Sequence, residues 1–196
     1  KKNLDGINVT IPFKRSIIKY LNTLKGDALK TSSVNTVYLN KKKLVGDNTD
    51  VYGFSSGVIK KIKNKIKIAG IIGAGGVTSS IILALIQKGV KRIYITNRTF
   101  SKLKIFKKKF KKVIYPVRWD NRYKAFGNVQ ILINVTSLGM LGKKDLKFDF
   151  SIFNKKINVV DIVYNPENTR FLKDARKNGH KIFTGMDMFI DRKSTR

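Results

Sequence analysis

Apolar and polar positions are patterned differently in the two parts of this 196-residue chain. From residue 67 onward, short apolar runs alternate with segments in which apolar residues recur every three or four positions. The runs predict strands at 68–72, 92–96, 113–115, 129–134, 158–163 and 181–183, and the periodic segments predict helices at 76–88, 101–111 and 168–178. Such alternation is typical of an α/β fold with a doubly wound parallel sheet that has helices on both faces.

The first 54 residues follow a less regular pattern, which predicts part of a small separate α/β domain. The expected elements are a strand over 7–11, a helix over 13–24 that begins beside Pro12, and a second strand over 34–39. A polar loop over 46–50 comes next, and Asp50 is a candidate N-cap of the helix that follows it.

These patterns divide the chain into four predicted parts. Residues 1–54 form the small domain, 55–184 the larger one, and 185–190 begin a helix that returns to the small domain. Residues 191–196 are polar and interrupt this apolar helix, and their sequence is what a common sequencing adapter would encode. We therefore expect 191–196 to be a non-native tail.

A glycine-rich turn links the first strand of the larger domain to its first helix. Gly73 permits a tight turn, Gly75 lets the backbone approach a pyrophosphate, and Gly76 opens the helix whose N–H groups then face the phosphates. Thr78 stands where Gly or Ala is usual. This context predicts a Rossmann-like dinucleotide-binding domain, and the alternative is a plain strand–helix turn.

The residues that end the second strand of the larger domain indicate which coenzyme binds. In this fold an acidic residue there accepts the ribose 2′-hydroxyl of NAD. The segment 97–102 contains no acid, and Asn97, Arg98, Thr99 and Lys102 offer hydrogen-bond donors instead. Arg98 suits a 2′-phosphate, so the sequence favours NADP. The alternative is that Arg98 is a surface cation and Thr99 only caps the next helix.

The net charge of +30 first suggests a nucleic-acid partner. Of the 42 basic residues, however, 33 are lysine and 9 are arginine, whereas reading of base edges favours arginine. Lysine is abundant throughout the chain, including the apolar segments, so the charge indicates compositional bias. We expect no nucleic-acid partner.

Cysteine is absent and His180 is the only histidine. Disulfides, thiol nucleophiles and cysteine-based or histidine-rich metal sites are therefore excluded, and no metal site is predicted. A Ser-His-Asp triad is disfavoured, and His180 is expected at the surface or at an edge near the last strand. No apolar run approaches the roughly 20 residues that a membrane-spanning helix needs, so no membrane partner is expected.

Eight stretches of the sequence resemble the shikimate dehydrogenase family. They occur in the family's order at residues 8–14, 34–36, 46–50, 73–76, 97–99, 134–140, 161–166 and 185–186. The stretches Asn-Val-Thr-Ile-Pro-Phe-Lys at 8–14 and Gly-Asp-Asn-Thr-Asp at 46–50 are highly specific. The resemblance implies a two-domain cytoplasmic enzyme, monomeric or homodimeric, that reversibly reduces 3-dehydroshikimate to shikimate with NADPH, on the route to chorismate and the aromatic amino acids.

The resemblance also implies roles for residues on the substrate side. Lys14 and Asp50 would be the catalytic pair, Thr10 and Asn35 would hold substrate hydroxyls, and Tyr164 would line the cleft. Hydride delivery to a ketone builds negative charge on its oxygen, and an ammonium group can supply both a proton and a positive charge there. Without the motif, Lys14 would be one more solvated lysine.

On the coenzyme side, the resemblance implies that segment 97–99 reads the 2′-phosphate. The stretch 135–140, with Thr136, would border the nicotinamide, and Gly185 and Met186 would lie near its ring. Asn134 and Thr136 have an alternative role as ordinary hydrogen-bonding residues at a strand end.

Family members begin with an earlier strand bearing a Ser-x-Ser motif and continue into a longer helix, so the chain is expected to be a fragment lacking both. The alternative that such a fragment is itself inactive stays open. Three other interpretations stay open: a quinate/shikimate dehydrogenase that uses NAD and would carry an acid near position 98 or 99, a nucleic-acid-binding module, and a nucleotide-binding remnant without catalysis.

Overall fold

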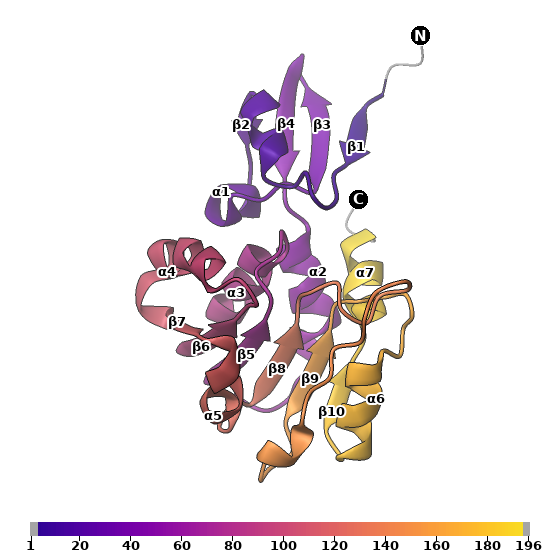
Figure 1. Ribbon diagram of the computed structural model, residues 1–196. Helices are drawn as coiled ribbons and strands as arrows, with labels where there is room; N and C mark the ends of the chain where they lie inside the picture. The colour runs from indigo at the N-terminus through magenta and orange to yellow at the C-terminus, as the bar shows by residue number, and fades with distance from the viewer. Residues whose placement is uncertain (1–3, 194–196) are drawn as a thin grey trace.

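The computed structural model describes residues 4–193 of the chain, with side chains up to residue 190, and contains two sheets in two domains (Figure 1). The smaller sheet has the order β1-β3-β4-β2. Its strands are β1 Gly6–Asn8, β2 Thr23–Leu24, β3 Thr36–Asn40 and β4 Lys43–Asp47. Neighbouring strands run antiparallel except β2 and β4, which are parallel. A small apolar core forms beneath it around Val9, Ala28, Val34 and Val37.

The helix predicted over 13–24 is wrong. A short 3-10 helix, η1 (Ser16–Tyr20), stands there and is followed by strand β2. The backbone N–H groups of Asn22 and Lys25 donate to Leu44 and Gly46 of β4, both at 2.9 Å, and so pull this segment into the sheet. Tertiary pairing thus overrides the local apolar period. The short helix α1 (Asp27–Thr31) was not predicted from the sequence.

The larger sheet is parallel throughout, as predicted, and has the order β10-β9-β8-β5-β6-β7. Its strands are β5 Ile68–Ile72, β6 Arg92–Thr96, β7 Ile114–Val117, β8 Ile131–Asn134, β9 Asn158–Asp161 and β10 Lys181–Phe183. The first strand of this domain lies in the middle, and the chain winds outward from it in both directions. The carboxyl ends of β5 and β8 therefore form the switch point at which ligands of doubly wound sheets bind.

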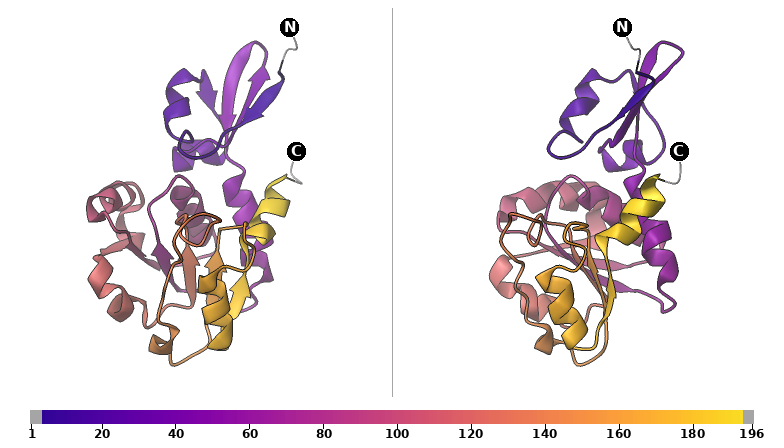
Figure 2. Two further views of the ribbon diagram at one scale, coloured as in Figure 1. Left: turned by 45° about the vertical axis from the view of Figure 1, so that its right-hand side comes forward. Right: turned by 90° about the vertical axis from the view of Figure 1, so that its right-hand side faces the viewer.

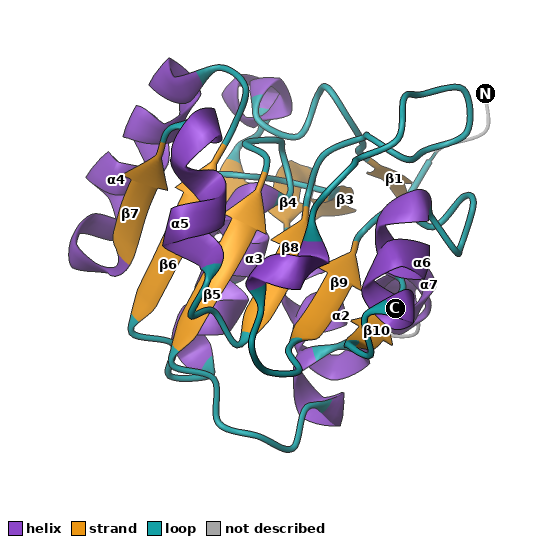
Figure 3. Ribbon diagram, turned by 60° about the horizontal axis from the view of Figure 1, so that its bottom comes forward, coloured by secondary structure: helices purple, strands orange, loops and turns teal. Residues whose placement is uncertain are grey.

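Helices cover both faces of the larger sheet (Figure 3). One face packs against α2 (Asp50–Gly57), α3 (Thr78–Gln87), α4 (Lys104–Phe110) and α7 (Gly185–Lys193). The other packs against α5 (Arg122–Phe126) and α6 (Arg170–Lys177). The short elements η2 (Ile59–Lys61), η3 (Phe100–Leu103), η4 (Lys111–Val113), η5 (Trp119–Asn121) and η6 (Phe150–Ile152) complete the fold. The predicted α/β class with a doubly wound sheet is confirmed, while α5, η5 and η6 were not predicted.

Of the two positions expected for His180, the edge position near the last strand is confirmed, because His180 precedes the edge strand β10, whereas the surface position is wrong, because only 7% of the residue is exposed. It stands just before β10, where its Nδ1 accepts the backbone N–H of Ile157 at 3.3 Å and its ring packs against Phe150 and Phe153. The loop 143–157 folds over the sheet and supplies these rings, which a local pattern around His180 does not reveal.

The helices α2 and α7 lie side by side, and α2 links the small domain to the larger one (Figure 2). The predicted domain boundary after residue 54 falls inside α2. The helix expected to return from residue 185 is α7, and it runs three residues into the segment predicted to be a tail. Residues 194–196 of that segment lie outside the described residues.

Gly57 of α2 packs directly against the backbone of α7, and Gly57→Ala is expected to destabilise the fold. An added Cβ would collide with the backbone carbonyl of Asp187 and come within 3.0 Å of the Met188 nitrogen. Overpacking of this kind costs about 1–3 kcal/mol. Urea unfolding would measure it, with Gly127→Ala as control, because the nearest atom to a Cβ there is 3.8 Å away. Equal stability of the two variants would contradict the prediction.

Candidate active site between the two sheets

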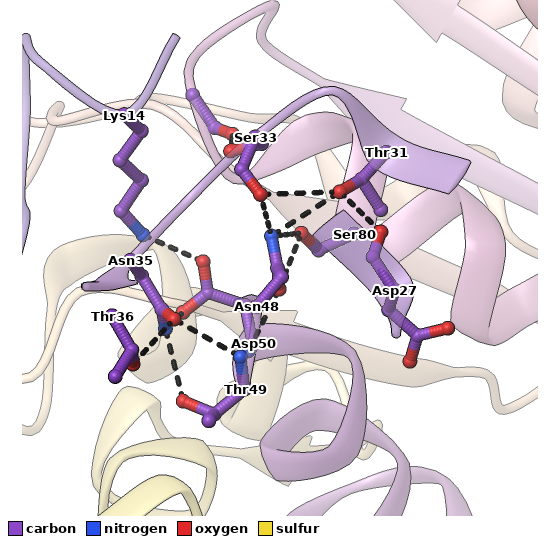
Figure 4. A network of polar contacts seen from close by, with 11 residues as sticks. Lys14, Asp27, Thr31, Ser33, Asn35, Thr36, Asn48, Thr49, Asp50 and Ser80 are labelled. Atoms are coloured by element: carbon purple, nitrogen blue, oxygen red, sulfur yellow. Dashed lines mark hydrogen bonds and ion pairs between the residues drawn. The ribbon is translucent and has the colours of Figure 1, made fainter. Parts of the chain in front are cut away.

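A buried ion pair lies between the domains. Nζ of Lys14 is 2.6 Å from Oδ2 of Asp50, and the two residues are 6% and 0% exposed (Figure 4). Lys14 comes from the turn after Thr10, and Asp50 is the first residue of α2. Burial of one of these charges without the other would be very unfavourable, so the two side chains depend on each other's presence.

The side chain of Asn35 holds the pair from the other side. Its Nδ2 donates to Oδ1 of Asp50 at 2.9 Å and to Oγ1 of Thr49 at 3.0 Å, and its Oδ1 accepts the Thr49 backbone N–H at 3.0 Å. Asp50 is therefore not the N-cap that we predicted. Thr49 is the cap residue, and the Asp50 carboxylate points to Lys14 and Asn35 instead.

Thr10 is brought close to this pair by the backbone. The N–H of Val9 donates to the carbonyl of Asn35 at 2.8 Å, which places the segment ending in Thr10 against Asn35. Thr10 itself is exposed. The structure thus gathers four of the five residues predicted on the substrate side: Lys14, Asp50, Thr10 and Asn35.

The glycine loop stands next to Lys14. Gly73 has φ +119°, and a Cβ there would lie 2.8 Å from Cγ2 of Thr136, so the loop fits tightly against the carboxyl end of β8. Gly75 is exposed. The Lys14 stem passes Gly76, since a Cβ at Gly76 would lie 3.5 Å from Cδ of Lys14. The loop is open where a phosphate would approach and closed where it packs, which fits a dinucleotide.

The residues predicted to read the 2′-phosphate follow β6. Arg98, Thr99 and Lys102 are exposed, and Nδ2 of Asn97 donates to the Thr99 carbonyl at 2.9 Å, which shapes the turn. Thr99 precedes η3 without a capping bond from its side chain. This group is separate from Lys14, because it follows β6, whereas the glycine loop beside Lys14 follows the neighbouring strand β5.

The other predicted residues lie where β9 and β10 end, on the side of β5 away from β6. They are Tyr164, Gly185 and Met186. Tyr164 is 48% exposed and its ring stacks on Phe189 of α7 at 4.9 Å between centroids. Met186 is half-buried. A Cβ on Gly185 would collide with the carbonyls of Ile162 and Val163, so α7 can start this close to β9 only with glycine.

Asp161 is a buried carboxyl group at the end of β9 that the sequence analysis did not single out. It accepts hydrogen bonds from Oγ1 of Thr169 at 2.7 Å, from Nδ2 of Asn134 at 3.0 Å and from the Val163 backbone at 3.0 Å. Oδ1 of Asn134 in turn accepts from the N–H and hydroxyl of Thr136. The sequence did contain a signal for this residue, because an acidic residue at the end of an apolar strand is unusual.

Burial raises the pKa of Asp161 to about 6. Its three hydrogen bonds act in the opposite direction, but the effect of burial is larger. The folded chain therefore binds a proton more tightly than the unfolded chain. Stability from this group is complete below its ordinary pKa of 3.8 and is lost as the pH rises through about 6.

Relative to Asp161→Asn, which does not titrate, the original chain should lose up to about 3 kcal/mol of stability between about pH 4 and pH 7. Urea unfolding of both proteins across this range measures the difference. If the original chain instead became more stable relative to Asp161→Asn as the pH rises, the raised pKa of Asp161 would be contradicted.

Among the side chains that the structure describes, from residue 4 to residue 190, no group of three or more His, Asp or Glu is placed to hold a metal ion. In the same range, no helix is both long and apolar enough to cross a membrane.

Comparison with known families places the chain. Residues 58–169 match the family described as shikimate/quinate 5-dehydrogenase, and residues 1–37 match the shikimate dehydrogenase substrate binding domain. The chain belongs to this family. The family and the dehydrogenase class predicted from the sequence are confirmed.

Among curated relatives, the shikimate dehydrogenase (NADP(+)) of Pelagibacter ubique is 38% identical over 191 residues, covering 97% of this chain and 70% of the relative. The enzyme of the same name from Dictyoglomus turgidum is 39% identical and covers 94% and 68%.

Solved structures agree in fold. Shikimate dehydrogenase of Aquifex aeolicus gives a TM-score of 0.84 at 33% identity, covering 96% of this chain and 69% of that one. The Thermus thermophilus enzyme, solved with NADP(H) and shikimate, gives 0.83 at 27% identity with the same coverage. Quinate dehydrogenase of Corynebacterium glutamicum, solved with NAD, gives 0.87 at 27% identity, again covering 96% and 69%.

Proposed function

We propose that the chain catalyses the reversible NADPH-dependent reduction of 3-dehydroshikimate to shikimate. The observation that carries the proposal is the buried Lys14–Asp50 pair beside the glycine loop, in a chain of this family. The curated relatives bear the name of this NADP-dependent activity. The expected cytoplasmic location and monomeric or homodimeric state are part of the proposal.

The residues present suit NADP. Gly73, Gly75 and the first turn of α3 would hold the pyrophosphate, and the exposed group at 97–102 would hold the adenosine 2′-phosphate. Thr136, Gly185 and Met186 would border the nicotinamide half. NADPH supplies a hydride when it is bound.

Lys14 would give a proton to the substrate oxygen as the carbonyl becomes an alcohol, and its charge would stabilise the negative charge that develops there. Asp50 would orient the ammonium group and accept a hydrogen bond from a ring hydroxyl, and Asn35 would hold another ring hydroxyl. Thr10 and Tyr164 would contact the same ring from the two sides of the cleft. In the oxidation of shikimate, neutral Lys14 would take the proton back.

The experiment is to mix the purified chain with 3-dehydroshikimate and NADPH and to follow loss of NADPH absorbance, with product identified by chromatography. Shikimate formation that requires NADPH is the expected result. Absence of product, while NADPH binding is retained, would overturn the proposal and favour a nucleotide-binding protein without catalysis. Quinate with NAD serves as the comparison substrate and coenzyme.

A further inference from the structure

A second buried polar group joins the two domains next to the catalytic pair (Figure 4). We call it the Asn48 cluster, and its members are Thr31, Ser33, Asn48 and Ser80. All four are buried, with exposures between 0% and 4%. The first three belong to the small domain, whereas Ser80 lies on α3, the helix that follows the glycine loop.

The Asn48 amide is at the centre of this cluster. Its Nδ2 donates to the Ser33 carbonyl at 2.6 Å and also faces the hydroxyls of Ser80 at 3.1 Å and Thr31 at 3.3 Å. Its Oδ1 accepts the backbone N–H of Asp50 at 3.0 Å and the Ser80 hydroxyl at 3.3 Å. One side chain thus contacts both the residue that opens α2 and a residue of α3.

Ser33 adds a second link between the domains. Its hydroxyl donates to the backbone carbonyl of Gly76 at 2.9 Å. Gly76 is also the residue that the Lys14 stem passes. The cluster therefore connects the backbone of Asp50, the glycine loop and the start of α3 through hydrogen bonds that are buried or, at Gly76, partly buried. Fully satisfied buried networks of this kind are rigid.

We propose that Asn48 and Ser80 are positioning residues that fix Asp50 relative to the glycine loop, so that the Lys14–Asp50 pair faces the reactive end of the bound coenzyme. The inference rests on the proposed function, because it assigns the cluster a role in that reaction. Hydride transfer depends on alignment, and a displacement of about 1 Å can cost about a hundredfold in rate.

Ser80→Ala tests this inference with little change in volume. It removes one partner of the Asn48 amide from the α3 side, so the N-terminal turn of α2 should loosen although the substitution lies in the other domain. Hydrogen exchange read by mass spectrometry should become about tenfold faster in peptides spanning 48–53 and should stay unchanged in β5.

Shikimate oxidation by the same variant should show a kcat lower by about tenfold to a hundredfold, with a smaller change in KM. The primary isotope effect with shikimate deuterated at the oxidised carbon should rise, because a misaligned hydride transfer limits turnover more. Ser56→Ala is the matched control. It removes a buried hydroxyl of α2 that has no hydrogen-bond partner among the described residues, and it should change neither exchange nor kinetics.

Unchanged exchange at 48–53 in Ser80→Ala would overturn the link between the domains. Faster exchange with an unchanged kcat and isotope effect would overturn the positioning role. An equal rise in exchange throughout the chain would mean that the cluster only stabilises the fold as a whole, which would also overturn the positioning role. If the original chain does not oxidise shikimate, the proposed function fails, and the exchange result alone decides whether the link exists.

Discussion

Lys14→Ala is expected to lower shikimate turnover by about 10² to 10⁴, the range for loss of a positioned proton donor. The position of the ammonium group matters as much as its chemistry. It is held 2.6 Å from the Asp50 carboxylate in a buried site, and the aliphatic part of the Lys14 side chain passes the glycine loop. The KM for shikimate should change less, since Thr10 and Asn35 remain.

Steady-state kinetics with the original chain, Lys14→Ala and Lys25→Ala measure this effect. Lys25 is an exposed lysine of the same domain and serves as the control for loss of charge. Lys14→Ala also leaves Asp50 buried without its cation, so its unfolding must be measured in parallel and the kinetics run where it is folded. Turnover equal to that of the original chain would remove Lys14 from the mechanism.

Asp50→Asn should lower turnover as well, because an amide neither supplies the charge nor holds the ammonium group as firmly. The double variant should lose less than the sum of the two single losses in activation free energy, since in the proposed mechanism both residues serve one proton transfer. Strictly additive losses would mean that Lys14 and Asp50 act separately.

Arg98→Ala should weaken the binding of NADP at least tenfold and should change the binding of NAD much less. The guanidinium group is exposed after β6, in a segment without acidic side chains, and a charged pair with a 2′-phosphate is commonly worth more than the roughly 1.4 kcal/mol that a tenfold change requires. The original chain should accordingly prefer NADP by at least about tenfold.

Calorimetric titration of both coenzymes into the original chain, Arg98→Ala and Arg92→Ala measures this preference. Arg92 is exposed at the opposite end of β6, where its guanidinium lies over the Tyr115 ring, and is the matched control. Equal affinities of the original chain for NADP and NAD would contradict the assignment of Arg98.

These two variants would test the two ends of one proposed site. Lys14 lies over the glycine loop, and Arg98 follows the neighbouring strand β6. A result in which Lys14→Ala affects turnover and Arg98→Ala affects only coenzyme choice is expected if the pyrophosphate crosses the loop between them, as it does at the switch point of doubly wound sheets.

Several features could be predicted from the sequence because they depend on neighbours in the chain. The central parallel strands of the larger domain, such as 68–72, are apolar runs bounded by polar segments, and burial on both faces requires such runs. The glycine turn at 73–76 could be recognised because its backbone needs glycine. The eight motifs, which occur in the order of the family, were also enough to recognise the resemblance to it.

Other features depend on segments that lie far apart in the sequence and meet only in the fold. The apolar positions of 13–24 have a helical period, but pairing with β4 makes part of this segment a strand. Asp50 has the residue type of an N-cap, yet its carboxylate meets a lysine 36 positions earlier. His180 is buried by a loop that local sequence does not place against it.

The sequence by itself therefore determined the fold class, the family and the residue types of the proposed site. Only the tertiary structure decided which of those residues meet, and it added Asp161 and the Asn48 cluster. The physical reason is that a buried polar group must find its hydrogen-bond partner wherever the fold supplies one. For Asn48 these partners include the Ser80 hydroxyl, 32 positions further along the chain and in the other domain.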